Sequence, residues 1–122
     1  MRSLARFARR HNLISHRVYA FDFWGTLTDH PEIRRIARDY YSRGHEVHIV
    51  SAISPGLDMD SDAAYTQILD QIGVPFTAIH RTDHVPAQKV AILKKIKADC
   101  FWDDTPAYIK AAAEAGFTSI LV

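Results

Sequence analysis

Short apolar runs that stop abruptly at polar residues constrain most strongly what this chain can fold into. Val18–Asp22 reads Val-Tyr-Ala-Phe and then aspartate, Val47–Val50 is followed by Ser51, and Cys100–Trp102 is followed by Asp103-Asp104. Continuous apolar runs of this length are typical of strands buried on both faces. Phe76–Ile79 and Ser119–Val122 are predicted as two further strands.

Segments with helical periodicity separate these strands, and Ala52–Asp60, which holds Pro55 and Gly56, is predicted as a loop. The predicted helices are Pro31–Arg43, Ser61–Ile72, Pro86–Lys97 and Pro106–Ala115. Alternating strands and helices predict an α/β fold: a three-layer, Rossmann-like parallel sheet with helices on both faces. Ligands of such sheets bind beyond the carboxyl ends of the strands, so the polar residues there are the candidate site.

Charge is distributed unevenly along the 122 residues, a length that suits one domain. Residues 1–17 contain five arginines and no acidic residue, whereas the rest has 14 acidic and 10 basic residues. We therefore expect a basic N-terminal arm over 1–17, with a short helix at Ser3–His11, attached to a core over 18–122. The single cysteine, Cys100, favours a reducing, cytoplasmic location, and no apolar stretch approaches the roughly 20 residues of a membrane helix.

The strand-end residues suggest a metal and phosphate site. The carboxylates of Asp22, Asp103 and Asp104 would repel one another unless a cation lay between them, and Mg²⁺ with oxygen ligands satisfies that need. One carboxylate, that of Asp22, could then attack phosphorus. Ser51 can donate a hydrogen bond to a phosphate oxygen, and Lys89 can neutralise its charge.

This constellation resembles the haloacid dehalogenase superfamily. The matching segments, in the expected order, are Asp22-Phe23-Trp24-Gly25-Thr26-Leu27-Thr28, His48-Ile49-Val50-Ser51, Lys89 and Phe101-Trp102-Asp103-Asp104. The resemblance implies a magnesium-dependent phosphatase with Asp22 as nucleophile and Lys89 assisting catalysis. It further implies a metal held by Asp22, Asp103, Asp104 and the backbone carbonyl of Trp24, and a phosphoryl group held by Gly25, Thr26, Ser51 and Lys89.

Trp24 departs from the pattern of that superfamily, whose phosphatases carry an aspartate there as general acid. Because losing a general acid commonly costs about 10²–10⁴-fold in rate, the alternative is a non-catalytic binding or regulatory module. Trp24 itself suits either a packing wall or a stacking platform. A dehalogenase is a third hypothesis, disfavoured because those relatives usually enclose small substrates beneath a cap.

No cap domain fits between Asp22 and Ser51 or between Ile79 and Lys89, so the site is predicted to be open and capless. An open site suits a nucleic-acid end or a phosphoprotein as the phosphorylated partner. Gly44–Val122 is also loosely similar to the phosphatase domain of bacteriophage polynucleotide kinases, although no Gly-Lys-Ser or Gly-Lys-Thr loop is present. The terminal strand Ser119–Val122 could pair with a second chain in a homo-oligomer.

Each candidate residue also has a purely structural interpretation. Asp104 or Thr105 could cap the helix that begins at Pro106, and Ser51 could simply end a strand. Lys89 could be a solvated lysine like its neighbours on the same helix. The sequence leaves these alternatives open.

Overall fold

Five parallel strands form the centre of the molecule in a computed structural model that describes residues 16–53 and 61–122. The sheet order is β3-β2-β1-β4-β5, and every neighbouring pair is parallel. The strands are β1 (Val18–Phe21), β2 (Glu46–Ala52), β3 (Ala78–Thr82), β4 (Cys100–Asp103) and β5 (Thr118–Leu121). The predicted parallel α/β sheet is thereby confirmed.

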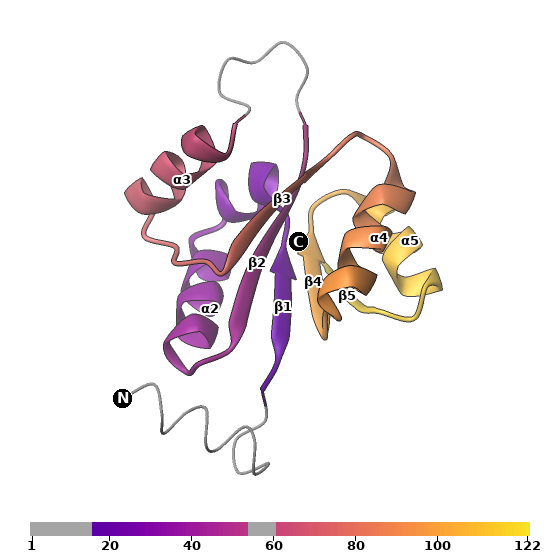
Figure 1. The fold of residues 1–122 in the computed structure, drawn as a ribbon, viewed down its shortest axis with the longest axis horizontal. Coiled ribbons are helices and arrows are strands. Elements are labelled where there is room, and N and C mark those ends of the chain that lie inside the picture. Colours follow the sequence, from indigo (N-terminus) through magenta and orange to yellow (C-terminus); the bar gives the residue numbers. More distant parts are fainter. Residues whose placement is uncertain (1–15, 54–60) are drawn as a thin grey trace.

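Helices cover both faces of this sheet, as predicted (Figure 1). α2 (Pro31–Ser42) and α3 (Asp62–Gln71) lie on one side, and α4 (Pro86–Ile96) and α5 (Pro106–Glu114) lie on the other. α2, α4 and α5 each begin at a proline. N–H groups in the first helical turn have no acceptor within the helix, so a residue without an N–H is well accommodated there. α3 begins after Ser61, whose hydroxyl accepts a hydrogen bond from the Ala64 amide at 3.1 Å.

Alternation of side chains along the strands builds two cores, one on each face. On the α2–α3 side, Phe21 and Ile49 are fully buried and Trp102 is nearly so. On the α4–α5 side, Ala20, Val50 and Phe101 are fully buried. This two-sided burial is the physical reason why the strands are continuously apolar and why their polar ends stand out in the sequence.

Predicted and observed bounds differ most for β3, which spans Ala78–Thr82 where Phe76–Ile79 was expected. β3 is an edge strand, so most of its residues are partly buried or exposed, and the strand extends through the polar His80 and Arg81. Apolarity alone therefore placed it too early. The partner that fixes its register is β2, which pairs Ile49 with Ile79 and Ser51 with Arg81.

Several predictions concern segments beyond or at the margin of the described residues. The helix predicted at Ser3–His11, nearly all of the basic arm and most of the predicted loop Ala52–Asp60 lie outside them. No helix within 16–53 and 61–122 is long and apolar enough to span a membrane. On the edge strand β5, Ile120 and Leu121 remain 40% and 54% exposed, and pairing of this edge with a second chain stays a prediction.

Candidate functional site

The turn after β1 places the first carboxylate at the sheet edge. Asp22 follows the strand directly, and its backbone N–H donates to the Trp102 carbonyl of β4 at 2.8 Å. The chain then turns through η1 (Phe23–Leu27), where the backbone leaves helical geometry at Trp24 and Gly25. This turn brings the Thr26 hydroxyl back to donate to Asp22 Oδ2 at 3.1 Å.

The carboxyl end of the neighbouring strand β4 supplies the other two carboxylates. Asp103 is fully buried, and its Oδ1 accepts a hydrogen bond from the Thr105 amide at 2.9 Å. Asp104 follows at the more exposed rim of the site. One carboxylate oxygen from each of Asp22, Asp103 and Asp104 lies within 4.8 Å of the others, the convergence that the strand-end pattern predicted.

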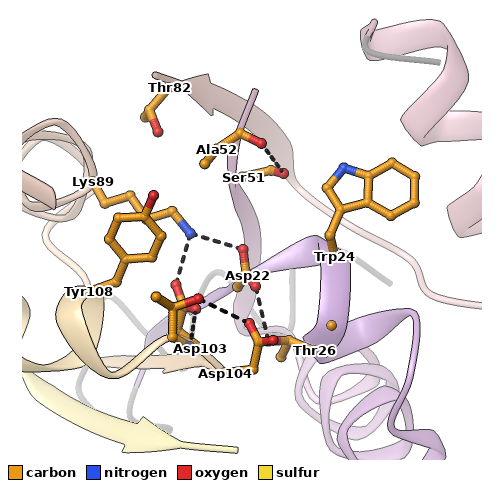
Figure 2. Close-up of polar contacts among 12 residues, drawn as sticks. Asp22, Trp24, Thr26, Ser51, Ala52, Thr82, Lys89, Asp103, Asp104 and Tyr108 are labelled. Carbon is orange, nitrogen blue, oxygen red and sulfur yellow. Dashed lines mark hydrogen bonds and ion pairs between the residues drawn. The ribbon is translucent and has the colours of Figure 1, made fainter. Parts of the chain in front are cut away.

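Lys89 of α4 bridges two carboxylates of this acidic cluster, those of Asp22 and Asp103 (Figure 2). Its ammonium donates to Asp22 Oδ1 at 2.9 Å and to Asp103 Oδ2 at 2.8 Å, and the side chain is only 1% exposed. The ammonium also lies 4.3 Å from the centre of the Tyr108 ring, a distance at which cations and aromatic faces attract. The interpretation of Lys89 as a solvated lysine is therefore wrong.

Burial and the neighbouring opposite charges shift the pKa values of Asp22, Asp103 and Lys89 in opposite directions. Burial raises the pKa of Asp22 to about 7, although the Lys89 ammonium pulls it down. Burial likewise raises the pKa of Asp103 above its ordinary value, against the same ammonium. Burial alone would lower the pKa of Lys89, but the two carboxylates outweigh it and raise that pKa. Burial thus favours the neutral forms of Asp22 and Asp103, whereas the two carboxylates favour the charged form of Lys89.

A cavity of about 230 Å³ opens beside the cluster. Asp22 and Asp104 contribute to its lining, and aromatic or ring-bearing side chains form much of the rest: Trp24, His84 and Tyr108. Ala52 and Thr105 complete it. The site thus combines an acidic end, which suits a cation, with flat ring surfaces, which suit a planar organic group.

The predicted site residues divide into two groups. Hydrogen bonds join Asp22, Asp103, Lys89 and Thr26, and Gly25 lies against Asp104. Ser51 is not brought to the carboxylates by any hydrogen bond that the structure shows; its buried hydroxyl lies 3.2 Å from Tyr65 Oη on the α2–α3 side.

Sequence reasoning missed two tyrosines of this region. Tyr108, on α5, flanks Lys89, and Tyr65, on α3, contacts both Ser51 and Trp24. Tyr65 lies three and four positions before Ile68 and Leu69, the apolar face predicted for that helix, so its inward orientation was detectable. Its polar contacts were not, because they join segments far apart in sequence.

The fold and site together define a Rossmann-like α/β domain with a cluster of carboxylates and a cavity at the carboxyl edge of its sheet. The solved structures it resembles include a universal stress protein in complex with cAMP, at a TM-score of 0.59 and 14% identity, covering 89% of this chain and 98% of that one. Another is a universal stress protein from Archaeoglobus fulgidus, at a TM-score of 0.50 and 14% identity, covering 87% and 98%. No protein-family model and no curated protein matches the sequence. At this identity the likeness establishes the fold alone.

These neighbours correct the predicted resemblance to haloacid dehalogenases and to bacteriophage polynucleotide kinases, which is wrong. The chain shares its fold with universal stress proteins, and no family comparison supports the dehalogenase superfamily. The physical reason lies in how the motifs were recognised. Aspartates at strand ends followed by Gly-Thr or by a helix are placed at one edge by any doubly wound parallel sheet, so their order does not by itself specify a family.

The predicted phosphatase activity, through an aspartyl-phosphate on Asp22, is likewise wrong, and so is the assignment as a hydrolase. A role for Lys89 at the site stays a prediction. The structural neighbours are universal stress proteins, one of them in complex with cAMP. The site offers a reason. Trp24 occupies the position where a general acid was needed, and its indole has no titratable group.

Proposed function

We propose that this chain binds a nucleotide together with a divalent cation, Mg²⁺, at the carboxyl edge of the sheet. The observation that carries the proposal is the convergence of three carboxylates within 4.8 Å beside a cavity walled by rings. The cation would neutralise the acidic end and attract the phosphate, while the rings would contact the base. A universal stress protein of the same fold binds cAMP, which supports the choice of a nucleotide as ligand.

The donor set fits a hard cation. Every candidate side-chain ligand is a carboxylate oxygen, the type that Mg²⁺ and Ca²⁺ prefer, and no histidine or cysteine belongs to the described cluster. When all are ionised, three carboxylates and the Lys89 ammonium leave two negative charges, which one divalent cation would balance. The backbone carbonyl of Trp24 stays a predicted further ligand. The bound cation would supply electrostatic attraction for phosphate oxygens.

Gly25 adds a steric argument for the same cluster. Its backbone has a φ of +80°, and a Cβ built at this position would collide with the Asp104 carboxylate. Only glycine therefore lets the turn after β1 lie this close to Asp104 while the carboxylate stays beside Asp22 and Asp103. The close approach of backbone to carboxylate favours a cradle for a small ion.

Binding of Mn²⁺, followed by electron paramagnetic resonance with Mg²⁺ as competitor, tests the cation site. We expect one ion per chain and at least a tenfold loss of affinity in Asp104→Asn, since one charged ligand is removed. Asp70→Asn, at an exposed aspartate near the end of α3, is the matched control and should bind like the wild type. Equal binding by Asp104→Asn and wild type would refute the site.

Isothermal titration calorimetry with cAMP, AMP and ATP tests the nucleotide. We expect binding that strengthens when Mg²⁺ is added, and the nucleotide should be recovered intact afterwards. Absence of heat with all three nucleotides at millimolar concentration, with Mg²⁺ present, would contradict the proposal. A nucleic-acid end or a phosphoprotein as ligand stays a prediction, and a phosphorylated oligonucleotide in the same titration distinguishes the first of these.

A further inference from the structure

Tyr65 is a fully buried tyrosine whose hydroxyl joins two parts of the site region. Its Oη accepts a hydrogen bond from Trp24 Nε1 at 3.2 Å and lies 3.2 Å from Ser51 Oγ. Tyr65 belongs to α3, Ser51 to β2 and Trp24 to the turn after β1, so the hydroxyl connects three elements that are distant in sequence. Burying a tyrosine hydroxyl costs free energy unless it is hydrogen-bonded, so the folded protein is expected to keep these contacts.

The rings around Tyr65 restrict the orientation of Trp24 further. The Tyr65 ring stacks on Phe23 with centres 4.6 Å apart, and it meets the Trp24 ring edge-on at 5.9 Å. Phe23 in turn contacts Trp24 edge-on at 4.8 Å. Ring packing holds the plane of the indole but provides no partner for its N–H. The Nε1–H donated to Tyr65 is what selects one orientation, since an indole has a single donor.

We infer that Tyr65 is a positioning residue for the nucleotide site, acting through Trp24 without touching the ligand. Trp24 forms part of the cavity wall, and its partly exposed indole offers a flat surface to a planar group. A wall held in one orientation before binding saves the entropy of ordering it during binding. The inference rests on the proposed function for the nature of the ligand, whereas the fixing of Trp24 by Tyr65 is independent of any ligand.

The hydroxyl can be removed with little change in shape by Tyr65→Phe. We expect the indole N–H resonance of Trp24 to shift and to exchange faster with solvent, while that of Trp102, which is 4% exposed on β4, stays unchanged. The two indole signals are assigned with Trp24→Phe. The matched control is Tyr41→Phe, at an exposed tyrosine of α2, which should alter neither signal. An unchanged Trp24 signal in Tyr65→Phe would overturn the inference.

Ligand binding separates positioning from general stability. Tyr65→Phe should weaken cAMP binding roughly three- to tenfold, the range expected for one hydrogen bond, and leave Mn²⁺ affinity unchanged. The variant Trp24→Phe already lacks the N–H donor. Adding Tyr65→Phe to it should therefore not weaken cAMP binding any further. Equal losses of cAMP and Mn²⁺ affinity would indicate a merely structural role and overturn the inference. If the wild type binds no nucleotide, the proposed function fails, and the indole signals alone decide whether Tyr65 positions Trp24.

Discussion

The ammonium nitrogen of Lys89 lies 2.8 Å from a carboxylate oxygen of Asp103, and both side chains are almost completely excluded from solvent. A buried pair of this kind is held by mutual neutralisation, since either charge alone would be very costly in the interior. Asp22, 2.9 Å from the same ammonium, makes the lysine the shared counter-ion of two carboxylates. The stability of the site region therefore depends on a single cation contributed by α4.

Removing the Lys89 ammonium should strongly destabilise the protein. We expect Lys89→Met to lower the free energy of unfolding by roughly 3–5 kcal/mol, because two buried carboxylates lose their counter-ion. Urea denaturation with a chelator present measures the loss. Lys94→Met, at an exposed lysine of the same helix, should change stability by no more than about 0.5 kcal/mol.

Added Mn²⁺ should recover part of the stability of Lys89→Met, since an ion that binds only the folded state stabilises it. Near-equal stability of the two variants would contradict this account of Lys89.

Gly25→Ala should cost more stability than alanine at a comparable glycine. Gly25 and Gly116 both have a positive φ, of 80° and 94°, but only at Gly25 would a Cβ meet other atoms, those of Asp104. Gly116→Ala should therefore show only the backbone cost of about 1–2 kcal/mol, and Gly25→Ala should exceed it and also weaken Mn²⁺ binding. Thermal denaturation of the two variants side by side provides the comparison, and equal losses would argue against a steric role for Asp104.

The ionisation of Asp22 should be visible in solution as a titration near neutral pH. Burial raises the pKa of this carboxyl from 3.8 to about 7 in the folded protein, so between these values the folded state binds more protons than the unfolded state. The contribution of Asp22 to stability must then fall as pH rises through that interval. Carboxyl ¹³C resonances measure the midpoint, and the stability of Asp22→Asn relative to wild type should increase with pH. A midpoint near 4 would be the contrary result.

A histidine pair on β2 and β3 should make stability fall in mild acid. His48 Nδ1 and His80 Nε2 are 2.9 Å apart, a hydrogen-bond distance, while His48 Nε2 lies 2.8 Å from Glu46 Oε1. Burial and the neighbouring His48 lower the pKa of His80 below its ordinary 6.5. As pH falls through 6.5 the unfolded chain takes up a proton that the folded chain resists, so stability decreases. The free energy of unfolding, compared near neutrality and at about pH 5.5, should change less in His80→Gln than in wild type.

The sequence determined the layered architecture and the edge at which the site lies. Buried strands such as Val18–Phe21 need continuous apolar residues. Helices begin at Pro31, Pro86 and Pro106 because proline suits the first helical turn. Both features can therefore be predicted from the local sequence. Because parallel strands end at one edge, the convergence of Asp22 with Asp103 also followed. The bounds of β3 could not be predicted in this way, since pairing with β2 sets where this edge strand begins and ends, and its own apolarity does not.

Only the tertiary structure decided what those carboxylates contact and which solved folds the chain resembles. It buried Lys89 between two aspartates, turned the Ser51 hydroxyl toward Tyr65, and hydrogen-bonded Tyr65 to Trp24. These contacts join residues 14 to 67 positions apart, and their formation depends on how helices pack on the sheet. Local propensity and spacing carry no information about such packing. Short motifs therefore predicted the convergence of the carboxylates but suggested the wrong family and the wrong activity.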